Sequence, residues 1–325
     1  MPWPLDIAWP SGLSAQPAIL LLVVLIARFL PLPAAYHPLT VFRYFAQQLA
    51  AKVNPDITRP QQQLYISGSL ALLVAWLPVM ALLYSLYVFS ELPLLLDALL
   101  LYTSLDWFNT QQQAKTLQQR LQSGQLTFAR EQATHVLCRK TTMLSEMGLS
   151  KALIESLTLR SAIQFVGVCF AFMLAGGLAA MGYRLVTELQ QQWNTKREQF
   201  CYFGAPAAKL ANFLTLLPKL LSSLLLALQA GVLVCYKLCR TTTRQNINRF
   251  SFCLLCCASA ALRRSLGGPV YYNAVKLQRS KILQQTDPTA ADISTTIRML
   301  QFSHFYLLLL VLCMSVLQLV WQLKQ

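Results

Sequence analysis

The chain has 325 residues, of which 55% are hydrophobic and only 12% are charged. Soluble globular domains typically carry about 25% charged residues, so this composition excludes an ordinary soluble protein. The formal net charge is +15, with 27 Lys and Arg against 12 Asp and Glu. Because the basic residues are interspersed with long apolar runs, we expect a membrane protein with no nucleic-acid partner.

Several apolar runs are long enough to cross a bilayer, which takes roughly 20 residues of helix. Every backbone amide in lipid needs an internal partner, and no run alternates like a barrel strand, so we expect helices. The predicted spans are residues 15–34, 64–90, 162–183, 210–236 and 303–321. A shorter run, Leu92–Leu105, contains Asp97 and is either a sixth crossing or an interfacial helix.

The first apolar run is expected to be a membrane anchor rather than a cleaved signal peptide, because no Lys or Arg precedes Arg28. Residues 107–161 (insert one) contain seven Lys and Arg against three Glu, and residues 237–302 (insert two) contain ten against two Asp. Such basic segments tend to face the cytoplasm. The predicted fold is an all-α integral membrane protein, one membrane domain over residues 1–325, with five to six transmembrane helices and two helical cytoplasmic inserts.

Nine cysteines are scattered through or beside the apolar runs, with a cluster at Cys253, Cys256 and Cys257. A C-x-x-C spacing can be redox-active or part of a metal site. Because there is no second such pair and no nearby His, we interpret the cluster as small buried hydrophobic side chains.

The segment from Gly124 to Leu157 carries the most specific pattern in the chain. It is G-Q-L-T-F-A-R-E-Q-A-T-H-V-L-C-R-K-T-T-M-L-S-E-M-G-L-S-K-A-L-I-E-S-L. Without a gap it resembles G-D-L-x-x-A-R-x-x-L-S-x-I-V-G-R-D-T-x-x-L-D-E-x-x-I-x-R-A-x-V-E-S-L of the membrane-bound cobinamide-phosphate synthases (CobD/CbiB type). Three further landmarks resemble that family in order and spacing: His37-Pro38, residues 202–213 with Leu217-Pro218, and Leu266–Tyr272.

This resemblance implies a late step of cobalamin biosynthesis, in which ATP drives the joining of an amino-alcohol phosphate to the corrinoid adenosylcobyric acid. It implies ATP and Mg²⁺ as cofactors. It also implies the bacterial inner membrane as the location, with a corrinoid substrate and other cobalamin-pathway proteins as partners. A non-catalytic membrane scaffold or sensor, similar to the more distantly related AmpE proteins, is the alternative. A transporter has less support, because we expect the spans to lack the charges that mark a pathway.

The sequence departs from the family pattern at its acidic positions. Gln125, Lys140 and Ser145 stand where the family carries aspartates. Mg²⁺ is normally held by one or two carboxylates, and phosphoryl transfer depends on such ions and on cationic side chains. We therefore expect weak or absent activity, and whether the chain is an enzyme stays open.

Glu146 and Glu155 are the predicted catalytic residues, because they are carboxylates that the segment retains. In an unbroken helix we expect them within roughly a quarter turn of each other, where they could together hold one metal ion. An ordinary helix pairing of Glu155 with Lys151 is equally consistent with the spacing. His135 and His304 lack partners at ligand spacing, so no metal site is predicted from them.

The other candidates are substrate-binding residues. Arg139 and Arg130 could bind phosphate, with solvated or headgroup-facing charge as the alternative. Gly267 and Gly268 could let the backbone approach a ligand, or form a plain turn. Three aromatic or imidazole side chains complete the set: Tyr271, Tyr272 and His37.

We expect inserts one and two to meet in a single cleft at the cytoplasmic face of the membrane. The best-retained family patterns lie in these two distant segments, and one shared cleft would explain both. This would bring Arg139, Glu146 and Glu155 near Gly267–Tyr272.

Overall fold

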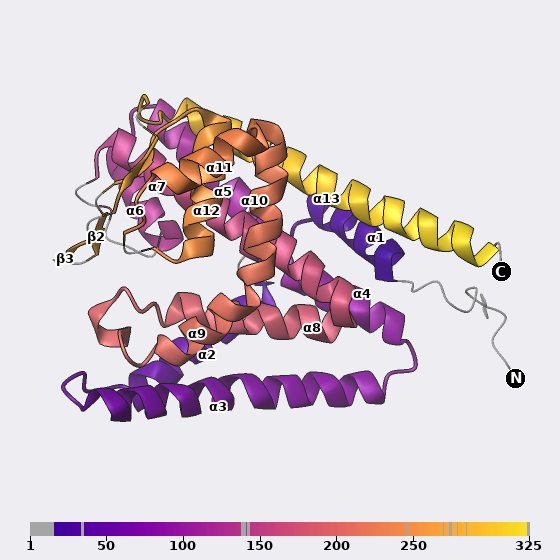
Figure 1. Ribbon diagram of the computed structural model, residues 1–325. Coiled ribbons are helices and arrows are strands. Elements are labelled where there is room, and N and C mark those ends of the chain that lie inside the picture. Colours follow the sequence, from indigo (N-terminus) through magenta and orange to yellow (C-terminus); the bar gives the residue numbers. More distant parts are fainter. Residues whose placement is uncertain are drawn as a thin grey trace, which may run out of the picture.

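The computed structural model describes residues 16–33, 36–137, 141, 144–245, 247–268, 270–272, 275–277, 279–283 and 285–323. The chain is almost entirely helical (Figure 1). Its first half contains α1 (Gln16–Phe29), α2 (Pro38–Val53), α3 (Gln61–Val88), α4 (Pro93–Ser104), α5 (Trp107–Gln122), α6 (Leu126–Leu137) and α7 (Glu146–Ser161). Its second half contains η2 (Ala162–Val166), α8 (Gly167–Gln192), η3 (Glu198–Phe200), α9 (Ala205–Leu214), α10 (Leu216–Ala230), α11 (Val232–Thr241), α12 (Arg249–Leu262) and α13 (Ala291–Leu323).

Four short strands interrupt the helices within insert two. They are β1 (Leu266–Gly267), β2 (Val270–Tyr272), β3 (Val275–Leu277) and β4 (Lys281–Ile282). β1 pairs antiparallel with β4, with Gly267 opposite Lys281, and β2 pairs antiparallel with β3. The expected all-α class is confirmed, and the Gly267–Gly268 segment is part of a small antiparallel ribbon rather than a plain turn.

The membrane-protein class is confirmed by helices that are long and apolar. Among the described residues, three helical segments are long and apolar enough to cross a bilayer, or four if the bent pair α9–α10 counts as one broken span. α3 and α13 carry large apolar side chains that are exposed along most of their length, as lipid-facing helices do. α4 has 12 residues, about 18 Å of helix, which is too short to cross the hydrocarbon core alone.

The apolar run expected as a single span at 162–183 is instead a helical hairpin. Ala175 and Gly176 have non-helical backbone angles inside α8, and Gly176 has a φ of +73°. The Tyr183 hydroxyl donates a hydrogen bond of 3.2 Å to the carbonyl oxygen of Ile163. Twenty residues of straight helix would separate these groups by about 30 Å, so the chain must reverse at Gly176. The start of the first arm and the end of the second arm of this hairpin therefore lie at the same end of the structure.

Asp97 on α4 stabilises the tip of this hairpin. Its Oδ1 accepts a hydrogen bond of 2.8 Å from the backbone N–H of Gly177, which begins the returning arm. A helix start leaves backbone donors without partners, and a carboxylate there both accepts a hydrogen bond and complements the helix dipole. A single aspartate in an apolar run thus has a structural role that explains its burial.

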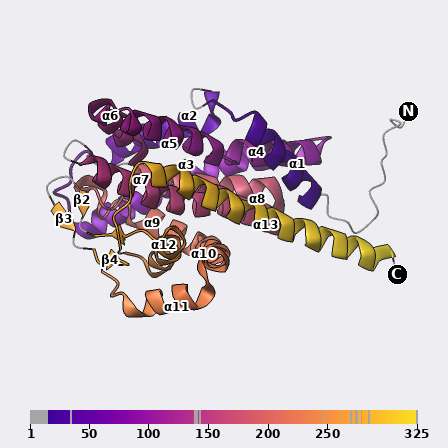
Figure 2. The same cartoon turned by 90° about the horizontal axis from the view of Figure 1, so that it is seen from above.

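The largest buried core includes the region where α5, α7, η2 and α13 meet. Seen from above, α13 runs between the group α10–α12 and the group α1, α4 and α5 (Figure 2). His304 of α13 is buried in this core, stacked on the Phe165 ring at 3.8 Å, with its Nε2 2.7 Å from the Ser161 hydroxyl. These contacts explain the buried histidine as a packing residue.

Candidate functional site

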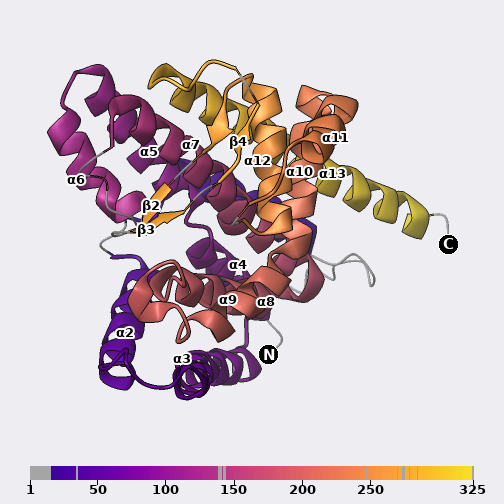
Figure 3. The same ribbon diagram turned by 60° about the vertical axis from the view of Figure 1, so that its left-hand side comes forward.

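One cleft with a volume of about 330 Å³ lies where inserts one and two meet the hairpin and α9. Figure 3 shows α7 and α12 on one side of this region and α8 and α9 on the other. Residues of α7, the end of α8, the following loop, α9, α10, α12 and the strand region contribute to its lining. The cavity therefore brings together residues that are more than 100 positions apart in the chain, such as Glu155 and Arg279.

Glu155 on α7 connects insert one to insert two at this cleft. Its Oε1 accepts a hydrogen bond of 2.8 Å from the backbone N–H of Gly267, and its Oε2 accepts one of 2.9 Å from Nη2 of Arg279. The expected meeting of Glu155 with the Gly267 segment is therefore present. Lys151 forms an ion pair with Asp287 at 3.7 Å. The hydrogen bonds of Glu155 go to Gly267 and Arg279, so the alternative pairing of Glu155 with Lys151 is a longer-range attraction and not its main contact.

Gly267 is required for this geometry on two counts. Its φ of +74° lies in the left-handed region that side chains disfavour. A Cβ at this position would collide with the carbonyl oxygen of Ser280, across the β1–β4 pairing. The backbone of Gly267 approaches the chain's own Glu155 carboxylate, while an approach of this glycine pair to a ligand stays a prediction.

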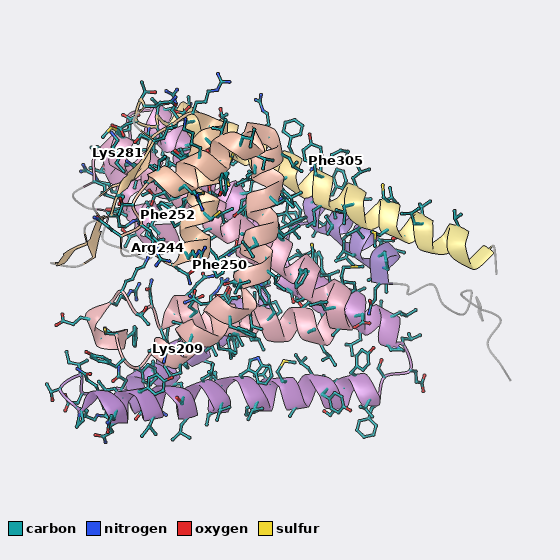
Figure 4. All side chains as sticks on the ribbon, in the orientation of Figure 1. Lys209, Arg244, Phe250, Phe252, Lys281 and Phe305 are labelled. Atoms are coloured by element: carbon teal, nitrogen blue, oxygen red, sulfur yellow. The ribbon has the colours of Figure 1, made fainter. Side chains whose placement is uncertain are left out.

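The cleft is strongly basic. Its charged lining residues are Glu155 and the four cations Arg160, Lys196, Lys219 and Arg279. Asn212, Asn248 and Ser251 add polar groups. In Figure 4, Lys209 lies on α9 below this region, whereas Arg244 and Phe250 lie on the α12 side. A site with this balance of charge is suited to an anionic ligand.

Sequence reasoning missed all four of these basic residues. Lys219 lies inside the apolar run expected as a span at 210–236, so the statement that the spans lack charged residues is wrong. An ionisable residue within such a run is itself a signal of a functional site, and this signal could have found Lys219. Arg160 and Arg279 each lie shortly after a segment that resembles the family, Arg160 after Leu157 and Arg279 after Tyr272.

Glu146 and Glu155 do not share a face of α7. The helix is unbroken from Glu146 to Ser161, with the Ser145 hydroxyl accepting a hydrogen bond from the Gly148 N–H at its start. Nine residues make two and a half turns, so the two side chains point in opposite directions. Glu146 is exposed and Glu155 is buried. The expectation of a quarter-turn separation and a jointly held metal ion is wrong, while a catalytic role for either residue stays a prediction.

The other predicted substrate-binding residues are distributed around the site. Arg130 uses its Nε to donate a 2.9 Å hydrogen bond to the Leu144 carbonyl oxygen, where it supports the approach to α7. Gly268, with a φ of +90°, lies next to Lys151. Tyr271 and Tyr272 are in β2, paired with β3. Arg139 lies outside the described residues. Their roles in binding stay predictions.

His37 lies in a separate buried cluster of charged residues that joins α2, the start of α5 and α8. Arg43 contacts both Asp106, at 2.6 Å, and Glu188, at 2.7 Å. Arg184, which is fully buried, contacts the same two carboxylates. The His37 Nδ1 accepts a hydrogen bond from the Leu39 N–H and so caps α2, and its Nε2 lies 4.0 Å from Asp106. This cluster is balanced in charge and holds three helices together.

The cluster shifts the pKa values of its members. Burial lowers the pKa of the His37 imidazole, and the Asp106 carboxylate offsets this effect only in part. Burial alone would raise the pKa of Asp106, but the guanidinium groups of Arg184 and Arg43 outweigh it and hold that pKa below its usual range. His37 is therefore neutral and Asp106 is ionised at neutral pH.

The residues of the cleft fit phosphate groups better than a protein-held Mg²⁺ ion. Mg²⁺ takes oxygen ligands, usually one or two carboxylates. Glu155 is the one carboxylate in the lining, and both of its oxygens already accept hydrogen bonds from Gly267 and Arg279. Among the residues that the structure describes, no three His, Cys, Asp or Glu side chains converge as a metal site.

Long apolar helices and a basic cleft beside them define an α-helical membrane protein with a polar site on one side. The chain belongs to the CobD/CbiB family: the family described as CobD/Cbib protein matches residues 20–300.

Curated relatives agree with this assignment. The cobalamin biosynthesis protein CobD of Chromobacterium violaceum is 25% identical over 280 residues, which cover 86% of this chain and 90% of that protein. CobD of Stutzerimonas stutzeri is 25% identical over 80% of this chain and 85% of its own length. The cobalamin biosynthesis protein CbiB of Salmonella choleraesuis is 27% identical over 62% of this chain and 65% of its own length. No solved structure matches the chain.

Proposed function

We propose that this protein acts in cobalamin biosynthesis as a cobinamide-phosphate synthase-like protein of the bacterial inner membrane. Its partners would be a corrinoid substrate and other proteins of the pathway. The observation that carries the proposal is the cleft that Glu155, Gly267 and Arg279 close between the two inserts, in which four basic side chains face one carboxylate. Glu155 and Gly267 belong to segments in which the chain resembles the synthases.

In the proposed reaction, an amide bond forms between a corrinoid carboxylate and the amine of an amino-alcohol phosphate, and ATP supplies the driving force. The basic side chains would bind and orient phosphate groups and stabilise the negative charge that develops on their oxygens. Glu155 would position Gly267 and Arg279 through its two hydrogen bonds. We derive no step through a Mg²⁺ ion held by the protein, because the lining offers no free carboxylate.

The expected activity is weak, since Gln125, Lys140 and Ser145 stand where the synthases carry aspartates. Removal of a single charge-stabilising group commonly reduces the rate about 10²–10³-fold. The test is purified protein in detergent with ATP, Mg²⁺, adenosylcobyric acid and an amino-propanol phosphate, together with growth of a synthase-deficient strain that requires corrinoid. Product formation or rescue of growth supports the proposal. Absence of both, with no corrinoid binding, overturns it.

A non-catalytic scaffold or sensor similar to AmpE is the second candidate. It is favoured by one observation: both oxygens of Glu155 are already held by the protein, as expected for a structural link between the inserts. Corrinoid binding without any turnover would support this candidate over the synthase.

A further inference from the structure

We infer that the basic cleft contains a binding subsite for a phosphoryl group, anchored by Lys219 with Arg279 as a second donor. The inference rests on the proposed function, because it concerns the same cleft. It goes beyond that function in assigning one recognisable group of the ligand to two residues that no family motif identified.

Lys219 is the first reason. Its side chain is only 4% exposed, yet it lines the cleft from the first turn of α10. No described residue supplies an ion pair or hydrogen-bond acceptor to its ammonium group. Burying an unpaired cation is unfavourable, so such groups are normally paired with an anion or neutralised. The missing partner of Lys219 is therefore expected from outside the chain.

The charges near Lys219 also favour an anionic partner from outside the chain. Lys196 is close enough to repel the Lys219 ammonium group. Glu155, the one acidic residue of the lining, is held by Arg279 and by the Gly267 N–H. The four cations of the lining outnumber its one carboxylate, so the cleft favours an anionic ligand.

Arg279 supplies a second, independent donor. Its side chain is 8% exposed, and one terminal nitrogen is bonded to Glu155. Its Nε is buried and has no hydrogen-bond partner. A buried donor without an acceptor costs stability, so a small movement of this side chain that brings the nitrogen to a ligand oxygen would be favourable. A phosphoryl group offers several oxygens and can accept from more than one such donor.

The size of the cleft favours a small ligand group. Its volume of about 330 Å³ lies at the lower end of the usual range for small-molecule sites. A phosphoryl group on a short chain fits such a space, whereas a whole corrin ring would have to remain at the opening. Three sources carry this chemistry: a soluble phosphate monoester, a nucleotide, and a phospholipid headgroup from the surrounding membrane.

The test compares wild type, Lys219→Met and the control Lys209→Met. Lys209 is an exposed lysine on the neighbouring helix α9, 3.3 Å from the Tyr65 hydroxyl. Binding of inorganic phosphate, amino-propanol phosphate and ATP is measured by titration calorimetry in detergent. Binding of phosphatidylglycerol, with phosphatidylcholine as reference, is measured by native mass spectrometry. We expect Lys219→Met to weaken binding of the preferred probe about 10- to 100-fold, as loss of a charged hydrogen bond implies, and Lys209→Met to leave it unchanged.

A second measurement separates binding from folding. Without ligand, Lys219→Met should unfold at the same or a higher temperature than wild type, because it removes an unpaired buried charge. Arg279→Lys keeps the positive charge but loses Nε, and should weaken binding of the same probe. Loss of phosphatidylglycerol alone would assign the subsite to a headgroup, and loss of the soluble probes would assign it to a substrate. Equal binding of every probe by wild type and Lys219→Met, or a ligand-free Lys219→Met that is less stable, overturns the inference. Either result is independent of whether corrinoid is converted.

Discussion

Arg43 and Glu188 are 145 residues apart in the chain, yet their side chains form two hydrogen bonds, of 2.7 and 3.1 Å. This contact attaches the amphipathic helix α2 to the returning arm of the α8 hairpin. Asp106 and Arg184 complete the arrangement, so each carboxylate contacts two guanidinium groups. Because the charges balance inside a buried site, removal of one member leaves the others without compensation.

We expect Glu188→Ala to destabilise the protein by about 3–5 kcal/mol, since it leaves the buried Arg184 and the partly buried Arg43 facing a single carboxylate. Glu198→Ala, at an exposed position on η3, is the matched control and should leave the unfolding midpoint unchanged. Thermal unfolding of both variants in the same detergent measures the difference. Equal midpoints for the two variants would show that the cluster does not hold the helices together.

The stability of the protein should fall as the pH drops below 6.5, and His37 should contribute to that fall. Burial lowers the pKa of His37 from 6.5, so the unfolded chain takes up a proton that the folded chain resists. Stability supplied by the neutral imidazole is thus present above pH 6.5 and decreases below it. The depressed pKa of Asp106 has the same sign but acts below pH 3.8. Unfolding midpoints between pH 7 and pH 5 should decrease less in His37→Asn, which keeps a capping side chain, than in wild type. Parallel curves would contradict the assignment.

Gly267→Ala should disrupt the bridge between the inserts far more than Gly124→Ala does. Both glycines have a φ of +74°, so both alanines carry the backbone cost of the left-handed region, about 1–2 kcal/mol. A Cβ at Gly124 meets no atom within 4 Å, whereas one at Gly267 collides with the Ser280 carbonyl oxygen. The excess loss of stability in Gly267→Ala reports on the β1–β4 contact. Limited proteolysis of insert two should accelerate in that variant alone.

Mild oxidation should crosslink Cys239 of α11 to Cys253 of α12. Their sulfur atoms lie 3.7 Å apart, and both side chains are partly exposed. Thiol–disulfide exchange with oxidised glutathione would form one protein disulfide and release two molecules of reduced glutathione. Peptide mapping under non-reducing conditions should recover the linked pair, and Cys253→Ser should abolish it. The exposed Cys201 should form only mixed adducts with glutathione. A crosslink to Cys201 instead would contradict the packing of α11 on α12.

Hydrophobicity predicted the class of fold because run length alone distinguishes a lipid-facing helix such as α3 or α13. It could not predict the hairpin, since a run of apolar residues has the same composition whether the chain continues or reverses at Gly176. The reversal depends on Asp97, which lies 80 residues from its hydrogen-bond partner Gly177. Hydrophobicity located the apolar runs but did not indicate whether the chain continues or reverses within each run.

The candidate site was predictable where a motif carried it, and not elsewhere. Resemblance within two segments led to the meeting of Glu155 with Gly267. The predicted pairing of Glu146 with Glu155 is wrong because nine residues of α-helix place the two side chains on opposite faces. Lys219 had been grouped with an apolar run, and the cluster around Arg43 and Glu188 has no local pattern, because its members come from three distant elements.

The α8 hairpin changes the topology that the chain can have across the bilayer. The Asn54 side chain, at the α2–α3 connection, donates a hydrogen bond of 2.7 Å to the Gln199 carbonyl oxygen. Lys196, from the same loop as Gln199, lines the cleft together with Ile247, which precedes α12. The connections α2–α3, α8–α9 and α11–α12 are therefore neighbours. A simple alternation of spans would instead place them in two different compartments. Between any two of them the chain must cross the bilayer an even number of times, and reporters inserted in all three should register the same compartment.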